Sequence, residues 1–155
     1  MRVLLYTFLL ISILTACNKS DDSSQSTNTI PQATQKELLT AKAWKYAAWT
    51  VTPPIKDSAG VLVSDVLHYK PACEQDDIII FYTNGTVSFD QGASQCDPTA
   101  PQNMLNTWAL LNNNTEISIS GNKYRVDLIS ADSMKWSFDD WQGSTQHVHS
   151  IVFAH

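Results

Sequence analysis

Residues 115–139 read TEISISGNKYRVDLISADSMKWSFD, and this stretch decides the fold. Apolar and polar residues alternate in three successive segments, which is the pattern of β-strands that bury one face. Gly121-Asn122 is a two-residue hairpin signal between the first two segments. The turn forms two apolar pairs on one face, Ile119 with Tyr124 and Ile117 with Val126. We therefore expect a hairpin with a single apolar face.

The connection to the third segment has two candidate registers. A two-residue turn sets Leu128 opposite Lys135 and mixes apolar and polar side chains on each face. A three-residue turn at Ser130-Ala131-Asp132 gathers the apolar residues in three pairs, Leu128 with Met134, Val126 with Trp136 and Tyr124 with Phe138. Because a slip of one residue moves every side chain to the other face, we expect the second register.

A second hairpin is predicted for residues 76–92, DDIIIFYTNGTVSFDQG. A two-residue turn at Asn84-Gly85 sets Cys73 directly opposite Cys96. A three-residue turn instead gathers four large apolar side chains on one face: Ile79, Phe81, Val87 and Phe89. Since each burial contributes about 1.5–3 kcal/mol, we favour the three-residue turn. A β-bulge near Asp76 or Gly92 would then restore the contact between the cysteines.

The rest of the folded region is also predicted to be mostly strands. A capping-box pattern, Thr34 with Glu37, first indicates one short helix. Strands are then expected at Trp44–Thr52, Val63–Tyr69, Leu105–Leu111 and His147–Phe153. Pro53-Pro54 should end the first of them, because proline cannot donate to a ladder. About eight strands in hairpin order favour an all-β fold that closes into a small antiparallel barrel, with a β-sandwich as the alternative.

The amino-terminal residues predict export and a lipid anchor. Arg2 and the apolar run Val3–Leu14 have the character of a signal peptide, too short to span a bilayer as a mature helix. The run ends in Leu14-Thr15-Ala16-Cys17, which resembles the bacterial lipobox that marks a cysteine for lipidation and for cleavage just before it. We therefore expect a leader at residues 1–16 and lipid on Cys17, whose acyl chains hold the protein at a membrane.

Residues 17–31 are predicted to be the lipidated cysteine and a flexible tether, because residues 18–29 contain no apolar side chain. The folded domain is expected at residues 32–155. We expect the protein at the outer membrane, on its periplasmic face or at the cell surface. The formal net charge is −5 and no basic run is present, which argues against binding to nucleic acid.

Two cysteines remain once Cys17 is acylated. In an oxidising compartment Cys73 and Cys96 are expected to form a disulfide, which contributes about 3 kcal/mol in the chain-entropy model. Two free buried thiols or half of a metal site are the alternatives. The sequence offers no CxxC or HxxxH companion that would indicate a zinc site.

The order of these features carries a family resemblance. After the lipobox, the polar tether and the short helix, it rests on the following residues: Trp44, Cys73, Asp76-Asp77, Phe81, Asn84-Gly85, Gly92, Cys96, Thr107-Trp108-Ala109-Leu110, Tyr124 and Leu128. This pattern resembles the small lipocalin-like lipoproteins of Gram-negative bacteria over nearly the whole mature chain. The resemblance implies an up-and-down β-barrel with room for an internal cavity.

Two histidines are candidate ligand-binding residues. His147 and His149 alternate on one predicted strand and therefore share a face with Ile151 and Phe153. If that face points inward, the two imidazoles can bind a polar ligand or a metal ion. In the alternative, the histidines face solvent and Val148 and Val152 point inward.

Trp141 is the third candidate, because it lies in Asp139-Asp140-Trp141-Gln142-Gly143, a predicted loop. There it would stack on a sugar, line the barrel mouth or cap the barrel. Trp44, Trp108 and Trp136 lie in strand patterns and are expected in the core, and the direction of Trp49 stays open.

The sequence holds no nucleophile elbow, P-loop, HExxH or dinucleotide fingerprint, so we expect no enzyme and no cofactor. The leading hypothesis is an envelope lipoprotein whose barrel binds a small apolar or amphipathic ligand. The alternative is a non-catalytic interaction module that contacts an envelope protein or a glycan through its loops. The two differ in the interior: a carrier needs a cavity of about 300 Å³ or more, whereas a core filled by Trp and Phe favours the module.

Overall fold

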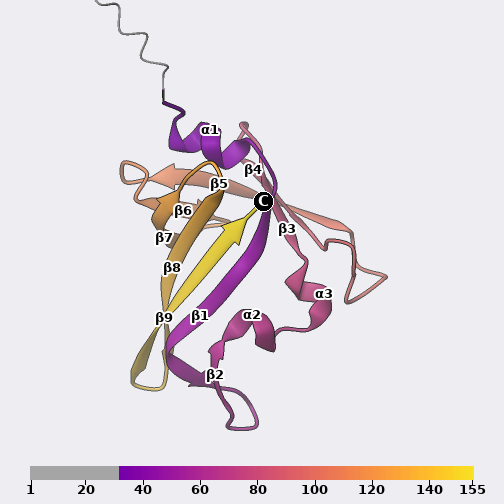
Figure 1. Cartoon of the computed structure of the whole chain (residues 1–155), viewed down its shortest axis with the longest axis vertical. Coiled ribbons are helices and arrows are strands. Elements are labelled where there is room, and N and C mark those ends of the chain that lie inside the picture. The colour runs from indigo at the N-terminus through magenta and orange to yellow at the C-terminus, as the bar shows by residue number, and fades with distance from the viewer. Residues whose placement is uncertain (1–31) are drawn as a thin grey trace, which may run out of the picture. The chain divides into compact units, whose positions relative to one another are not determined.

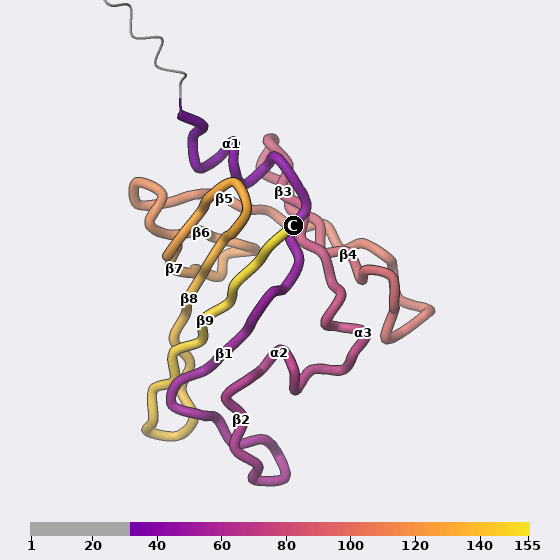
Figure 2. Tube along the Cα trace, viewed as in Figure 1, coloured from indigo at the N-terminus to yellow at the C-terminus, as the bar shows by residue number. Residues whose placement is uncertain are grey.

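The computed structural model describes residues 32–155 (Figure 1, Figure 2). The predicted leader, the Cys17 lipidation site and the tether lie outside these residues. The helices are α1 (Gln35–Thr40), α2 (Val66–Tyr69) and α3 (Ala72–Gln75). The strands are β1 (Trp44–Lys56), β2 (Leu62–Asp65), β3 (Ile78–Phe81), β4 (Thr86–Asp90), β5 (Asn103–Leu111), β6 (Glu116–Ile119), β7 (Asn122–Ile129), β8 (Ser133–Gln142) and β9 (Thr145–Ala154).

Within residues 32–155, eight strands close a barrel, and the pairing of β1 with β9 closes it. Neighbours are antiparallel and follow chain order from β3 to β9. β1 pairs with β9 from Lys45 to Thr52, but with β3 only at Trp44 and Lys45. β2 pairs with β1 between Thr50 and Lys56. The predicted antiparallel up-and-down barrel is confirmed, and the β-sandwich alternative is wrong.

Helix α1 and large aromatic side chains fill one end of the barrel. Trp44, Trp108 and Trp136 are buried, as predicted, and Phe81 lies edge-on to the last two with ring centroids 5.2 and 5.9 Å away. The fully buried Leu39 of α1 belongs to this core, and its carbonyl accepts a 2.9 Å hydrogen bond from the Trp44 indole. In Figure 1 α1 lies at this end of the barrel, at the top of the view.

The predicted capping box begins α1. The Thr34 hydroxyl accepts from the Glu37 amide at 3.2 Å, and the Glu37 carboxylate accepts from the Thr34 amide at 2.7 Å. These two bonds satisfy amide groups that have no partner within the helix and so stabilise its first turn.

The first predicted hairpin has the expected faces but a different turn. Ile117 pairs with Tyr124 and Ile119 with Asn122, so the pairing is displaced from the predicted one while the same side chains point inward. The turn residues are Ser120 and Gly121, both in the left-handed region with φ of 51° and 85°. This matches the two positive φ values of a type I′ turn, and the predicted Gly121-Asn122 turn is wrong by one residue.

The β7–β8 pair contains both registers that the sequence allowed. Val126 pairs with Trp136, as predicted, but Leu128 pairs with Lys135 and Ile129 with Met134. A bulge between Val126 and Leu128 changes the register. The predicted Leu128–Met134 pair is therefore wrong: Ile129 is buried in its place, and Leu128 is exposed.

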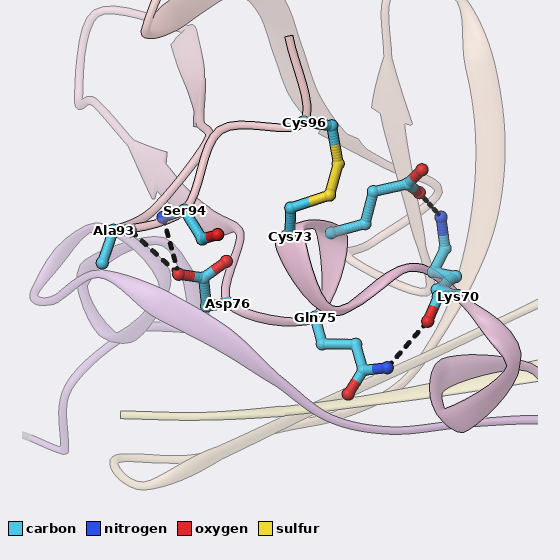
Figure 3. The surroundings of a disulfide bond; sticks show 8 residues. Lys70, Cys73, Gln75, Asp76, Ala93, Ser94 and Cys96 are labelled. Carbon is cyan, nitrogen blue, oxygen red and sulfur yellow. Dashed lines mark hydrogen bonds and ion pairs between the residues drawn. A yellow bond between two sulfur atoms is a disulfide. The ribbon is translucent and has the colours of Figure 1, made fainter. Parts of the chain in front are cut away.

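The second predicted hairpin is confirmed, with Phe81 opposite Val87 and Ile79 opposite Phe89. The disulfide between Cys73 and Cys96 is also present (Figure 3). It joins α3 to the loop after β4, where the Asp76 carboxylate accepts from the amides of Ala93 and Ser94 at 2.9 and 3.0 Å. The cysteines thus meet just beyond the strands rather than within the ladder.

Two predicted strand ends are wrong. β1 continues through Pro53-Pro54 to Lys56, because β2 pairs with Ile55 and Lys56 beyond the prolines, and neither proline has a partner in the ladder among the strands of residues 32–155. The predicted strand Val63–Tyr69 ends at Asp65, whose carboxylate accepts from the His68 amide at 3.0 Å and caps α2. Local capping therefore converts the second half of that segment into a helix.

We predict that Gly92→Ala destabilises the protein more than Gly143→Ala. Both glycines are left-handed, with φ of 64° and 65°, so both substitutions carry a similar backbone cost of about 1 kcal/mol. A Cβ at Gly92 would also lie 2.3 Å from the Asp76 carbonyl oxygen, whereas a Cβ at Gly143 meets no atom within 4 Å among residues 32–155. Urea denaturation should show about 3 kcal/mol lost for Gly92→Ala. Equal losses would contradict the close packing of this loop on Asp76.

Candidate binding site at the barrel mouth

The barrel opens at the end away from α1, because its strands differ in length. β3, β4 and β6 have four or five residues, whereas β1, β8 and β9 have ten or more. The inward residues of the long strands therefore continue past their short neighbours. We call this end the mouth.

A small cavity of about 120 Å³ lies inside the mouth. Four half-buried aromatic side chains from β1, β7 and β8 stand at its walls, and we call it the aromatic slot: Tyr46, Trp49, Tyr124 and Phe138. Tyr46 stacks on Trp49 with ring centroids 6.0 Å apart, and Tyr124 lies edge-on to Phe138 at 5.5 Å. Buried residues, Trp136 and Phe153 among them, close its inner side.

A larger, open groove of about 650 Å³ adjoins the slot and shares Tyr124 and Phe138 with it. We call it the polar groove, because charged residues of β6, β7 and β8 provide most of its remaining lining: Glu116, Lys123, Arg125, Asp139 and Asp140. Arg125 binds Asp139 through two hydrogen bonds of 2.8 and 2.9 Å, which lower the pKa of that carboxyl. The mouth therefore places an apolar slot beside a charged surface.

The segment that contains α2 and α3 places charged residues near two side chains of the slot, Trp49 and Tyr46. The Lys70 ammonium lies 5.1 Å from the Trp49 ring centroid and also pairs with Glu74. The Lys70 carbonyl accepts a 2.7 Å hydrogen bond from the Gln75 side chain, as Figure 3 shows. Burial, followed by the charge of Asp77, raises the pKa of Tyr46 to about 12.

His147 and His149 point inward, so the alternative with Val148 and Val152 inward is wrong. His149 stacks face to face on Phe138, with centroids 4.6 Å apart. Its Nδ1 accepts a 3.1 Å hydrogen bond from the Trp49 indole, which can only donate, so the proton of the neutral imidazole is on Nε2. Asp140 lies 4.0 Å from that Nε2. His149 therefore holds Trp49 in place at the slot.

His147 belongs to a different surface from the slot. It lines a groove beside Pro53 and Pro54, and its Nδ1 lies 2.8 Å from the Pro53 carbonyl, which can only accept. The proton therefore sits on Nδ1 and a lone pair on Nε2. Neither this Nε2 nor that of His149 has a hydrogen-bond partner among residues 32–155.

The structure gives no support to the metal alternative for these histidines. Across residues 32–155, no three His, Cys, Asp or Glu side chains are grouped so that they could hold a metal ion. Coordination through Nε2 of His149 would also require a proton on Nδ1, which already faces the Trp49 N–H. The hydrogen bond that positions Trp49 is thus incompatible with metal binding at Nε2.

Trp141 does not join the two histidines. It lies in β8 opposite Gln146, so the prediction of a loop is wrong, and its side chain is 61% exposed. Its neighbour Asp140 pairs with the inward His147, which places Trp141 on the outer face. Trp49, left open by the sequence, is the tryptophan at the mouth.

The comparisons with known proteins add no family. No family model matches the sequence, and no curated protein is significantly similar to it. The closed antiparallel barrel of eight strands with a short amino-terminal helix is consistent with a lipocalin-like fold. Of the helices in the part of the chain that the structure describes, none is long and apolar enough to cross a membrane.

We predict that the stability of the protein falls as the pH is lowered below about 6.5. Burial, opposed by Asp140 and assisted by His147, lowers the pKa of His149 below its value in the unfolded chain. The unfolded state therefore binds the proton first, and stability present above pH 6.5 is lost as the pH falls toward the folded pKa. The His149→Gln variant should lose less free energy of unfolding between pH 7.5 and pH 5 than the wild type.

The matched control for this measurement is His68→Gln, at an exposed histidine of α2. It should keep the pH dependence of the wild type in the same urea titrations. An unchanged pH dependence in His149→Gln would contradict the conclusion that burial keeps His149 neutral in the folded protein.

Proposed function

We propose that this protein is a non-catalytic, lipid-anchored envelope protein that binds one end of a small amphipathic ligand at its barrel mouth. The observation that carries the proposal is the aromatic slot of about 120 Å³, which opens beside a charged groove of about 650 Å³. An apolar group enters the slot, and the polar remainder of the ligand lies along the groove.

The size of the slot limits the ligand. Ligand pockets usually occupy about 300–1,000 Å³, whereas an apolar cavity of about 150 Å³ is enough for benzene. At about 120 Å³ the slot is slightly smaller than that cavity, so it suits a group no larger than one ring and is too small for a long acyl chain. Trp136, Phe81 and Phe153 fill the space that a carrier would leave open, so the apolar cavity does not reach the roughly 300 Å³ expected of it and would enclose only one end of a ligand.

The sequence supports the proposed location. Lipid on Cys17 would hold the protein at the outer membrane, on the periplasmic face or at the cell surface, and the polar residues 18–29 would separate the barrel from the bilayer. A ligand-binding mouth in that position would be accessible to small molecules of the envelope.

The interaction module is the second candidate, and the apolar residues exposed near the tips of the long strands favour it. There Val61, Leu62 and Trp141 expose more than half of their surface. Leu62 also lines the groove of about 520 Å³ that contains Pro53, Pro54 and His147. An envelope protein or a glycan docked there would contact this second groove and leave the aromatic slot free.

The test is native mass spectrometry of the protein purified from its own membranes, which should detect a small bound molecule. Ile151→Phe adds bulk to the slot, and Val148→Phe adds the same ring on the outer face of the same strand. We expect Ile151→Phe to lose the molecule and Val148→Phe to keep it.

Ile119→Phe provides a second slot-filling variant from another strand, and circular dichroism verifies that each variant is folded. A molecule retained by both folded slot variants would contradict binding in the slot. Loss on Trp141→Ala alone would favour the interaction module.

A further inference from the structure

The aromatic slot already has a cation beside it. The Lys70 ammonium lies 5.1 Å from the centroid of the Trp49 ring, within the range of a cation–π contact. Trp49 cannot turn away from it freely, because its indole N–H is bound to His149. One face of the Trp49 ring is therefore held where it stabilises a positive charge.

The other aromatic walls of the slot also favour a positive charge. Tyr46, Tyr124 and Phe138 present aromatic rings, which carry negative charge on their faces. Tyr46 and Tyr124 keep their phenol protons over the physiological range, since burial raises the pKa of both. A cation in the slot would thus lie close to several aromatic rings, although His149 already covers one face of Phe138.

Carboxylates surround the slot on two sides. Glu74 and Asp77 lie on the side of α3, where Glu74 holds Lys70 and the charge of Asp77 reaches Tyr46. Asp140 lines the polar groove on the opposite side and approaches His149 to 4.0 Å. Five acidic side chains lie at the entrance (Glu74, Asp77, Glu116, Asp139 and Asp140) and three basic ones (Lys70, Lys123 and Arg125). The balance is negative and attracts a cation, in line with the net charge of −5.

We propose that the aromatic slot binds an organic ammonium group, methylated or protonated, and that Lys70 competes with it for the face of Trp49. This inference rests on the proposed function, because it names the chemical class of the ligand at the same slot. A neutral ring would make no use of the carboxylates. A carboxylate or phosphate headgroup would meet Glu74, Asp77 and Asp140 at the entrance.

The experiment compares two probes of the same shape. Choline carries a trimethylammonium group, and 3,3-dimethylbutan-1-ol replaces its nitrogen with carbon and has no charge. Both are titrated by calorimetry into the full lipidated protein in a sugar-headed detergent. We expect choline to bind at least about fivefold more tightly than the neutral alcohol, as one cation–π contact would provide.

Lys70→Gln tests the competition. It removes the ammonium from Trp49, so choline affinity should rise by about fivefold, while affinity for the neutral alcohol changes little. Lys42→Gln is the matched control, because it changes the net charge equally at an exposed site near Asp132. It should leave choline affinity within about twofold of the wild type.

Equal binding of the two probes, or no rise in choline affinity in Lys70→Gln, would overturn the ammonium inference. The proposed function would still stand if Ile151→Phe removes the molecule that copurifies from the membrane. If that molecule is insensitive to slot filling and neither probe binds, both proposals fail.

Discussion

The structure depends on the backbone pairing between β1 and β9, the contact that closes the sheet. It joins segments from the two ends of the folded region and so closes a loop that contains all the other strands of the barrel, which makes it an entropically costly contact. The same pairing brings Trp49 opposite Ile151 and places His149 within reach of the indole. Closure therefore forms the slot at the same time as the barrel.

A register shift within the β1–β9 pairing determines which side chains line the mouth. Between Tyr46 and Ala48 the register of β1 shifts, so that Tyr46 and Trp49, three residues apart, both face inward. A regular strand would direct them to opposite faces. The bulge thus brings two aromatic side chains to one cavity, where His149 fixes the second of them and Lys70 covers its ring.

Alternation and turn chemistry in the sequence predict most of the barrel. The Thr34 cap and the inward faces of residues 117–126 follow from local pattern, and the cysteine pairing follows from the two cysteines that remain besides Cys17. The bulges do not follow from this pattern. The bulge after Val126 exposes Leu128, and the bulge after Tyr46 left the direction of Trp49 undecided. The slot escaped prediction because an inserted residue inverts the faces without changing composition.

The most direct test of the account is ¹⁹F NMR of protein labelled with 5-fluorotryptophan. The chain has five tryptophans, which can be assigned by single Trp→Phe substitutions. When choline or the copurified membrane molecule is added, we expect the Trp49 resonance to shift most, with a smaller shift at Trp136 inside the slot. A shift confined to Trp141 on the outer face would contradict binding at the barrel mouth.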